Sequence, residues 1–150
     1  MVKLWKHLVV IIFSLVFSGY GLAFEIKSSN FVGQKTKIAQ LADQYDVIIV
    51  NPDGNYGTWY LNSPVLNDSQ YETYIAEDVV NDIDNSYSTN RSKMRRGITG
   101  LSMGGFGALN VAINNQQVFA AVTSMSGGVD LRPFAAEFGI AKVLGECKPI

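Results

Sequence analysis

The segment Gly100-Leu101-Ser102-Met103-Gly104 constrains the fold most, because it spells G-x-S-x-G after a short apolar run. In that setting a serine stands on a sharp turn between a strand and a helix, which lifts its hydroxyl above a sheet. The pattern therefore predicts a strand over Gly97–Thr99, a helix over Met103–Asn114, and Ser102 between them as a nucleophile. A chain built this way belongs to the α/β class.

The chemistry of such a turn depends on the backbone around the serine. The start of a helix directs free N–H groups toward the hydroxyl, so the N–H of Met103 is the expected first donor of an oxyanion hole. The turn itself is expected to comprise Gly100, Leu101, Gly104 and Gly105. Adjacent glycines weaken a helix, and they are explained if the first helical turn must approach a neighbouring strand or a substrate closely.

The sequence does not offer the usual base for this serine. Its only histidine is His7, near the N-terminus, whereas a catalytic serine is normally activated by a histidine that an acid orients. Asp130 and Glu137 follow the serine, but without a histidine to orient we interpret them as ordinary loop and helix residues. We therefore expect this chain alone to be inactive or weakly active.

The N-terminal segment has the pattern of an export signal. Lys3 and Lys6 precede the ten uncharged residues Leu8–Phe17, and Gly21-Leu22-Ala23 supplies small residues for cleavage. Residues 1–23 are therefore expected to be a signal peptide of a secreted or periplasmic protein, and residues 24–150 a single incomplete domain. The alternative is an uncleaved membrane anchor, because Leu8–Phe24 is uncharged over seventeen residues. That segment is the only expected contact with a membrane.

Composition argues against several classes of function. Without residues 1–23 the chain has ten basic and thirteen acidic residues, with no cluster that would follow phosphates, so we expect no nucleic-acid partner. Cys147 is the only cysteine, which excludes an internal disulfide. The chain has no G-x-G-x-x-G, no phosphate loop and no cluster of nitrogen or sulfur ligands, so we expect neither a cofactor nor a metal.

The rest of the chain alternates between helical patterns and short apolar runs. Helices are expected over 35–44, from the capping box Ser69-x-x-Glu72 onward, and over Pro133–Leu144. Strands are expected over 45–50 and 119–124. In the second helix Tyr71, Ile75, Val79 and Ile83 should share the face that lies on the sheet, and in the helix after Ser102 the expected common face holds Phe106, Leu109 and Ile113.

Five segments together resemble one known family. They are Asn51-Pro52-Asp53-Gly54, Gly57-Thr58-Trp59-Tyr60, Tyr71-Glu72-Thr73-Tyr74, Ile98 to Leu109, and Ser124-Met125-Ser126-Gly127-Gly128. In this order, between about Lys35 and Pro133, they are similar to the putative esterase family. That family includes esterase D (S-formylglutathione hydrolase), tributyrin and feruloyl esterases, and mycolyltransferases of the antigen 85 type.

The resemblance implies a partial α/β-hydrolase fold, with a mostly parallel sheet and helices on both faces. It implies a serine hydrolase of small carboxylic esters or thioesters that works through an acyl-enzyme. Ser102 matches the nucleophile, Met103 the oxyanion N–H donor, and Trp59 and Tyr60 fall near the acyl pocket. From the residues alone, an adjacent aromatic pair equally well closes the edge of a core.

The chain also departs from the family pattern at both ends. Family members have a strand and a His-Gly loop before the segment that resembles Gln34–Gly54, and an acid and a histidine on loops after the one that resembles Phe119–Ser124. We therefore expect the first strands, the second oxyanion donor and two triad members to be missing. Two other functions remain open: a secreted acyl- or carbohydrate-binding protein on a degenerate hydrolase scaffold, and an acyltransferase of the mycolyltransferase type.

Overall fold

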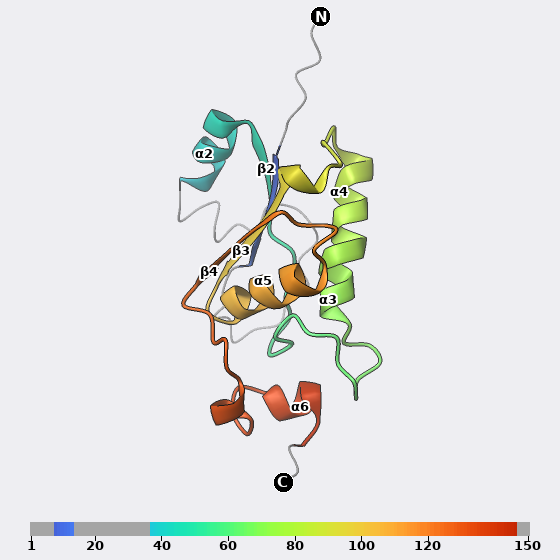
Figure 1. Cartoon of the computed structure of the whole chain (residues 1–150), viewed down its shortest axis with the longest axis vertical. Coiled ribbons are helices and arrows are strands. Elements are labelled where there is room, and N and C mark those ends of the chain that lie inside the picture. The colour runs from blue at the N-terminus through green and yellow to red at the C-terminus, as the bar shows by residue number, and fades with distance from the viewer. Residues whose placement is uncertain (1–7, 14–36, 147–150) are drawn as a thin grey trace, which may run out of the picture.

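The computed structural model describes residues 8–13 and 37–146. Their centre is a parallel four-stranded sheet in the order β2-β1-β3-β4, in which β1 and β3 are the inner strands (Figure 1). The strands are β1 (Leu8–Phe13), β2 (Val47–Val50), β3 (Arg96–Leu101) and β4 (Ala121–Met125). The strands expected over 45–50, 97–99 and 119–124 are confirmed, with shifted ends.

The N-terminal apolar run has an unexpected place in this structure. We expected Leu8–Phe13 to lie in an export signal, and we expected no strand before the first helix. The structure places these six residues in the sheet, where Val9 to Phe13 lie in register with Arg96 to Gly100. The expectation that no strand precedes the first helix was therefore wrong. An apolar run fits this place, because an inner strand of a parallel sheet is covered on both faces.

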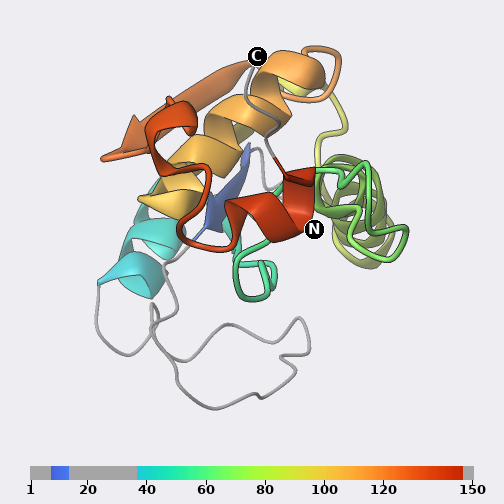
Figure 2. The same cartoon turned by 90° about the horizontal axis from the view of Figure 1, so that it is seen from below.

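Helices lie on both faces of the sheet, as expected. On one face are α5 (Met103–Asn114) and the long helix formed by α3 (Tyr71–Thr73), the π-helical η1 (Tyr74–Val79) and α4 (Val80–Ser86). On the other face lies α2 (Ile38–Tyr45), as Figure 2 shows in the view from below. The short elements are η2 (Lys93–Arg95), η3 (Arg132–Phe134) and α6 (Ile140–Leu144).

The core lies between the sheet and the long helix. The expected helix face is largely correct, since Ile75, Val79 and Ile83 are buried against Ile98 of β3 and Val111 of α5, while Tyr71 lies at its edge. Burial of such aliphatic side chains contributes about 1.5–3 kcal/mol each. The long helix therefore attaches to both β3 and α5, the two elements that flank Ser102.

The predicted capping box is wrong. The helix begins at Tyr71 after Gln70, whose side chain makes no capping hydrogen bond. The N–H of Thr73 in its first turn donates to Asn62 Oδ1 at 3.0 Å. Ser69 is held in the preceding loop instead, where its carbonyl oxygen accepts a hydrogen bond from the N–H of Ser63 at 2.8 Å. Glu72 is then free to reach across to α5.

Two further expectations about helices are corrected. In α5 the buried face consists of Gly104, Gly105, Gly107, Ala108, Val111 and Ala112, whereas Ile113 is 61% exposed. Small residues are selected there because the helix backbone itself approaches its neighbours. The expected helix over Pro133–Leu144 is interrupted, because Gly139 adopts a φ of +76° between η3 and α6.

Candidate active site

Ser102 alone separates β3 from α5, with β3 ending at Leu101 and α5 beginning at Met103. Its φ of 56° and ψ of −119° are unusual for a residue with a side chain, and such a conformation costs on the order of 1–3 kcal/mol. Two hydrogen bonds hold it: its N–H donates to the carbonyl of Met125 at 2.9 Å, and its carbonyl accepts from the N–H of Phe106 at 3.0 Å. Its hydroxyl does not cap α5, so the side chain is available for other contacts.

The glycines of the turn allow α5 to pack closely on the end of β4. A Cβ added to Gly105 would lie 2.8 Å from Ser124 Oγ and 2.9 Å from the carbonyl oxygen of Met125. Gly127 faces the same contact from the other side, since its added Cβ would overlap Ser124 Oγ. Gly100 lies in β3 opposite Ser124, and Leu101 is partly exposed. The expected reason for adjacent glycines, close approach to a neighbouring strand, is confirmed.

Ser102 also lies where α/β sheets commonly bind ligands. The chain runs from β1 to β2 at one edge and then builds β3 and β4 on the other side of β1, so the order of the strands reverses between β1 and β3. Such proteins bind ligands at the carboxyl ends of the strands beside that reversal, and Ser102 follows the carboxyl end of β3. The first N–H groups of α5, including that of Met103, have no partner within the helix and carry its positive dipole end.

The structure gives Trp59 and Tyr60 different environments, although both have a φ of 54°. Tyr60 is 1% exposed and its ring lies against Gly54 and Gly107. Burial, and the negative charge of Asp53, raise the pKa of Tyr60. In this conformation Tyr60 offers no surface to a ligand, which matches the interpretation of an aromatic that closes the core.

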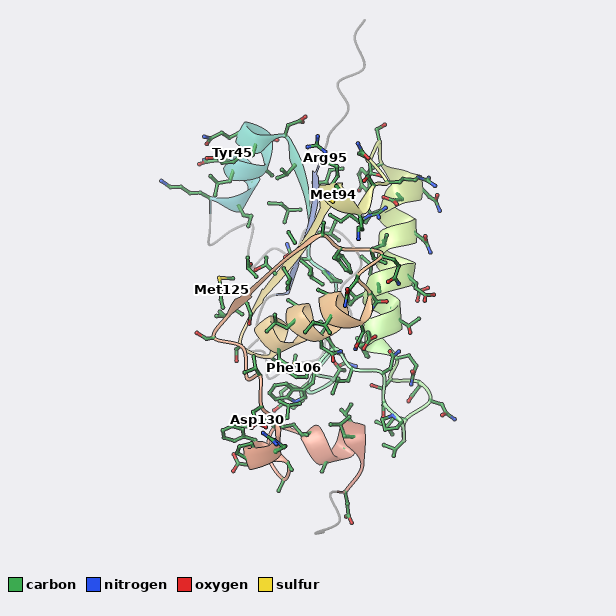
Figure 3. The ribbon with its side chains drawn as sticks, in the orientation of Figure 1. Tyr45, Met94, Arg95, Phe106, Met125 and Asp130 are labelled. Atoms are coloured by element: carbon green, nitrogen blue, oxygen red, sulfur yellow. The ribbon has the colours of Figure 1, made fainter. Side chains whose placement is uncertain are left out.

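Trp59 lies toward the C-terminal segment instead. Its indole N–H donates to the carbonyl oxygen of Phe138 at 3.0 Å, and a Cβ added to Gly128 would lie 3.7 Å from the edge of its ring. The rings of Trp59 and Phe106 meet edge to face, with centroids 5.6 Å apart and planes at 78°. Figure 3 shows Phe106 on the side of α5 that faces η3 and α6.

Phe106 is the residue of this site that the sequence analysis assigned elsewhere. We expected it on the core face of α5, but it is only partly buried and contacts Trp59. Its position four residues after Ser102 was the available signal, because residues four apart lie on the same side of a helix. The first turn of α5 thus carries Ser102, Met103 and Phe106, Trp59 contacts this turn through Phe106, and Tyr60 lies in the core.

Of the two acids that follow the serine, Asp130 lies in a loop as expected, whereas Glu137 lies in a bend between η3 and α6 and not in a helix. Asp130 forms an exposed ion pair with Arg132 at 2.8 Å, and hydrogen bonds from Arg132 lower the pKa of Asp130 to about 2. Glu137 is exposed. His7 lies outside the described residues, and β1, which follows it, begins at the end of the sheet opposite to Ser102.

Among residues 8–13 and 37–146, no group of three His, Cys, Asp or Glu side chains could hold a metal ion. In the same part of the chain, no helix is long and apolar enough to cross a bilayer.

Comparison with known sequences gives a consistent result. The family model described as Putative esterase matches residues 15–144. Esterase Rv1288 of Mycobacterium tuberculosis is 32% identical over 127 residues, which cover 83% of this chain and 26% of that protein. The chain thus spans about a quarter of this curated relative.

Comparison with solved structures adds the fold. The fluorophosphonate-binding serine hydrolase F of Staphylococcus aureus superposes with a TM-score of 0.77 at 18% identity, covering 99% of this chain and 54% of that one. An S-formylglutathione hydrolase from Agrobacterium tumefaciens gives a TM-score of 0.71 at 22% identity, covering 92% and 53%. The fold is therefore that of the α/β hydrolases, and the chain spans about half the length of these two structures.

Proposed function

The chain belongs to the Putative esterase family, and on that premise we propose that Ser102 is the nucleophile of a serine hydrolase of carboxylic esters or thioesters. The observation that carries the proposal is the backbone of Ser102, a strained conformation held by hydrogen bonds to Met125 of β4 and Phe106 of α5. Strain of this kind persists only where the surrounding structure enforces it, and it concentrates at active sites.

The proposed reaction has two steps. Ser102 Oγ attacks the acyl carbon and loses its proton to a base, and the alcohol or thiol leaves as the acyl-enzyme forms. Water then attacks the acyl-enzyme and releases the acid. In both steps negative charge develops on the former carbonyl oxygen, and the proposed donor that stabilises it is the N–H of Met103 at the start of α5.

The base is the part of the mechanism that the described residues do not supply. Residues 8–13 and 37–146 contain no histidine. Removing triad members from a serine hydrolase still leaves some rate above that of water, through the oxyanion hole and substrate binding. We accordingly propose weak hydrolysis by this chain alone, and saturable ligand binding without turnover as the alternative function.

The test is hydrolysis of p-nitrophenyl acetate and p-nitrophenyl butyrate by the full chain of 150 residues, with Ser102→Ala measured beside it. Ser126→Ala is the matched control, because Ser126 is an exposed serine that also follows a strand and also has a positive φ. Turnover that is lost in Ser102→Ala and kept in Ser126→Ala supports the proposal. Equal turnover by Ser102→Ala and the unmodified chain contradicts it.

The acceptor of the acyl group and the location of the protein are further parts of the proposal. A mycolyltransferase-type reaction would use the same acyl-enzyme with a sugar hydroxyl in place of water, so adding a sugar acceptor during turnover and looking for its ester tests that variant.

Export of the protein is proposed from the pattern of residues 1–23. Because Leu8–Phe13 forms β1, an exported chain that keeps this fold must also keep those residues. The mass of the mature protein decides whether it does.

A further inference from the structure

We propose that Phe106 sets the acyl-chain preference of this site, so that the site favours esters with an apolar acyl chain longer than acetyl. The inference rests on the proposed role of Ser102. It starts from the direction of a side chain in the first turn of a helix. Helical side chains point back toward the N-terminus, so Phe106 covers the turn that contains Ser102 and Met103.

The environment of Phe106 supports a role at the surface of the site. Its neighbours Gly105, Gly107 and Ala108 are buried against β4 and the core, whereas Phe106 is only partly buried. A phenylalanine that served only the core would lie on the buried face of α5. Phe106 instead packs edge to face with Trp59, with ring centroids 5.6 Å apart. We call these two rings, which meet four residues after the nucleophile, the apolar corner.

The second wall of this corner is held in place. Trp59 is 9% exposed, its indole N–H is bound to the carbonyl of Phe138, and a Cβ added to Gly128 would lie 3.7 Å from the edge of its ring. Because Trp59 is fixed from two sides, Phe106 has a stationary partner and the corner keeps its shape. An apolar chain attached to the acyl carbon at Ser102 can lie against the exposed part of the Phe106 ring, which Trp59 supports, whereas a methyl group is too short to cover it.

The experiment measures binding separately from hydrolysis. The chain contains two tryptophans, Trp5 and Trp59, so Trp5→Phe leaves Trp59 as the only indole. In that background, quenching of Trp59 fluorescence reports the binding of two probes that cannot be hydrolysed, 4-nitrophenyl butyl ether and 4-nitrophenyl methyl ether. Three additional methylene groups, partly covered, correspond to about tenfold tighter binding of the butyl ether.

Variants at Phe106 test whether this residue causes the tighter binding of the butyl ether. Phe106→Ala should reduce the tenfold ratio to about twofold, and Phe106→Leu, which keeps apolar bulk, should give an intermediate ratio. Ile113→Ala is the matched control, because Ile113 is an exposed apolar residue at the other end of α5, and it should leave the ratio unchanged. A folded Phe106→Ala with an unchanged ratio, or the absence of quenching by either probe in the parent chain, would overturn the inference.

The same proteins distinguish this inference from the proposed hydrolysis. Ser102→Ala should keep the binding ratio although it loses turnover. If the parent chain fails to hydrolyse any ester but its binding ratio still depends on Phe106, the proposal about Ser102 chemistry fails and the one about Phe106 stands. If p-nitrophenyl butyrate and acetate are hydrolysed with the same relative rates by the parent and by Phe106→Ala, the assignment of Phe106 is wrong.

Discussion

The ring of Tyr60 lies against Gly107 so closely that a Cβ at residue 107 would overlap it. The overlap involves the root of the side chain, including Tyr60 Cβ and Cγ, so the ring cannot swing aside as the end of a flexible chain could. This contact joins the loop that carries Trp59 to the helix that begins at Met103. It therefore fixes two sides of the candidate site relative to each other.

We predict that Gly107→Ala destabilises the protein. Alanine favours a helix by about 1 kcal/mol relative to glycine, but overpacking a dense core typically costs about 1–3 kcal/mol, and here the nearest atoms cannot yield. We expect a net loss in the free energy of unfolding, measured by urea denaturation. Gly128→Ala is the control, because its added Cβ would lie at an ordinary 3.7 Å from Trp59. Equal stability of the two variants would show that the Tyr60 contact is not tight.

Glu72 connects the long helix to α5, and its charge should contribute to stability. One carboxylate oxygen accepts hydrogen bonds from Asn110 at 2.9 Å and Asn114 at 3.0 Å, and the other accepts from Asn115 at 3.3 Å. Glu72→Gln keeps the size but turns an acceptor into an NH₂ group that faces donors. We expect a loss of about 1–2 kcal/mol in the free energy of unfolding.

The control for this prediction is Glu77→Gln, because Glu77 is an exposed glutamate on the same long helix. It removes the same charge without removing these hydrogen bonds. If both variants lose the same stability, the effect is one of net charge, and the hydrogen bonds to Asn110, Asn114 and Asn115 contribute nothing measurable.

Burial of Tyr60 predicts a specific loss of stability in alkaline solution. Its pKa is raised in the folded protein, mainly by burial and then by the charge of Asp53. The contribution of protonated Tyr60 to the free energy of unfolding is therefore complete below the pKa of about 10 that tyrosine has in the unfolded chain. It is lost as the pH rises above that value, by at most about 1.4 kcal/mol per pH unit. Thermal melts between pH 9 and pH 11 should fall less steeply for Tyr60→Phe than for the parent. Parallel curves would mean that Tyr60 titrates normally.

Part of this structure was predictable because the signals were local. The turn at Ser102, the helix Met103–Asn114 and the strand Val47–Val50 follow from residues next to one another, and all three are present. Errors arose where a local pattern competed with distant contacts. Glu72 fits a capping box in sequence, but the asparagine amides of α5 offer its carboxylate more donors than a helix start does.

The buried face of α5 and the assignment of Leu8–Phe13 as a strand also depended on contacts between residues far apart in the sequence. Phe106 has helical spacing for a core face, yet the core side of α5 is occupied by glycines because Tyr60 and β4 approach the backbone there. The run Leu8–Phe13 is equally apolar as an export signal or as an inner strand, and composition alone does not distinguish these uses. Its pairing with β2 and β3 shows the strand, and its use as an export signal stays a prediction.

That pairing yields a prediction about truncation. Removing residues 1–23 deletes β1, which lies between β2 and β3, so residues 24–150 should lose cooperative thermal unfolding. Removing only residues 1–7 should leave the transition largely intact, because this deletion ends before Leu8. Circular dichroism melts of the three chains test this. A cooperative transition in residues 24–150 would show that the sheet forms without β1, and that a cleaved, exported form can fold.

The central claim is that Ser102 forms an acyl-enzyme. The most direct test is to incubate the full chain with p-nitrophenyl acetate, quench with acid, and locate the acetyl group by peptide mass spectrometry. We predict one acetyl group on the peptide that contains Ser102, and none on the corresponding peptide of Ser102→Ala. Acetylation scattered over lysines and tyrosines, equal in the two proteins and absent from Ser102, would contradict the assignment of this serine as the nucleophile.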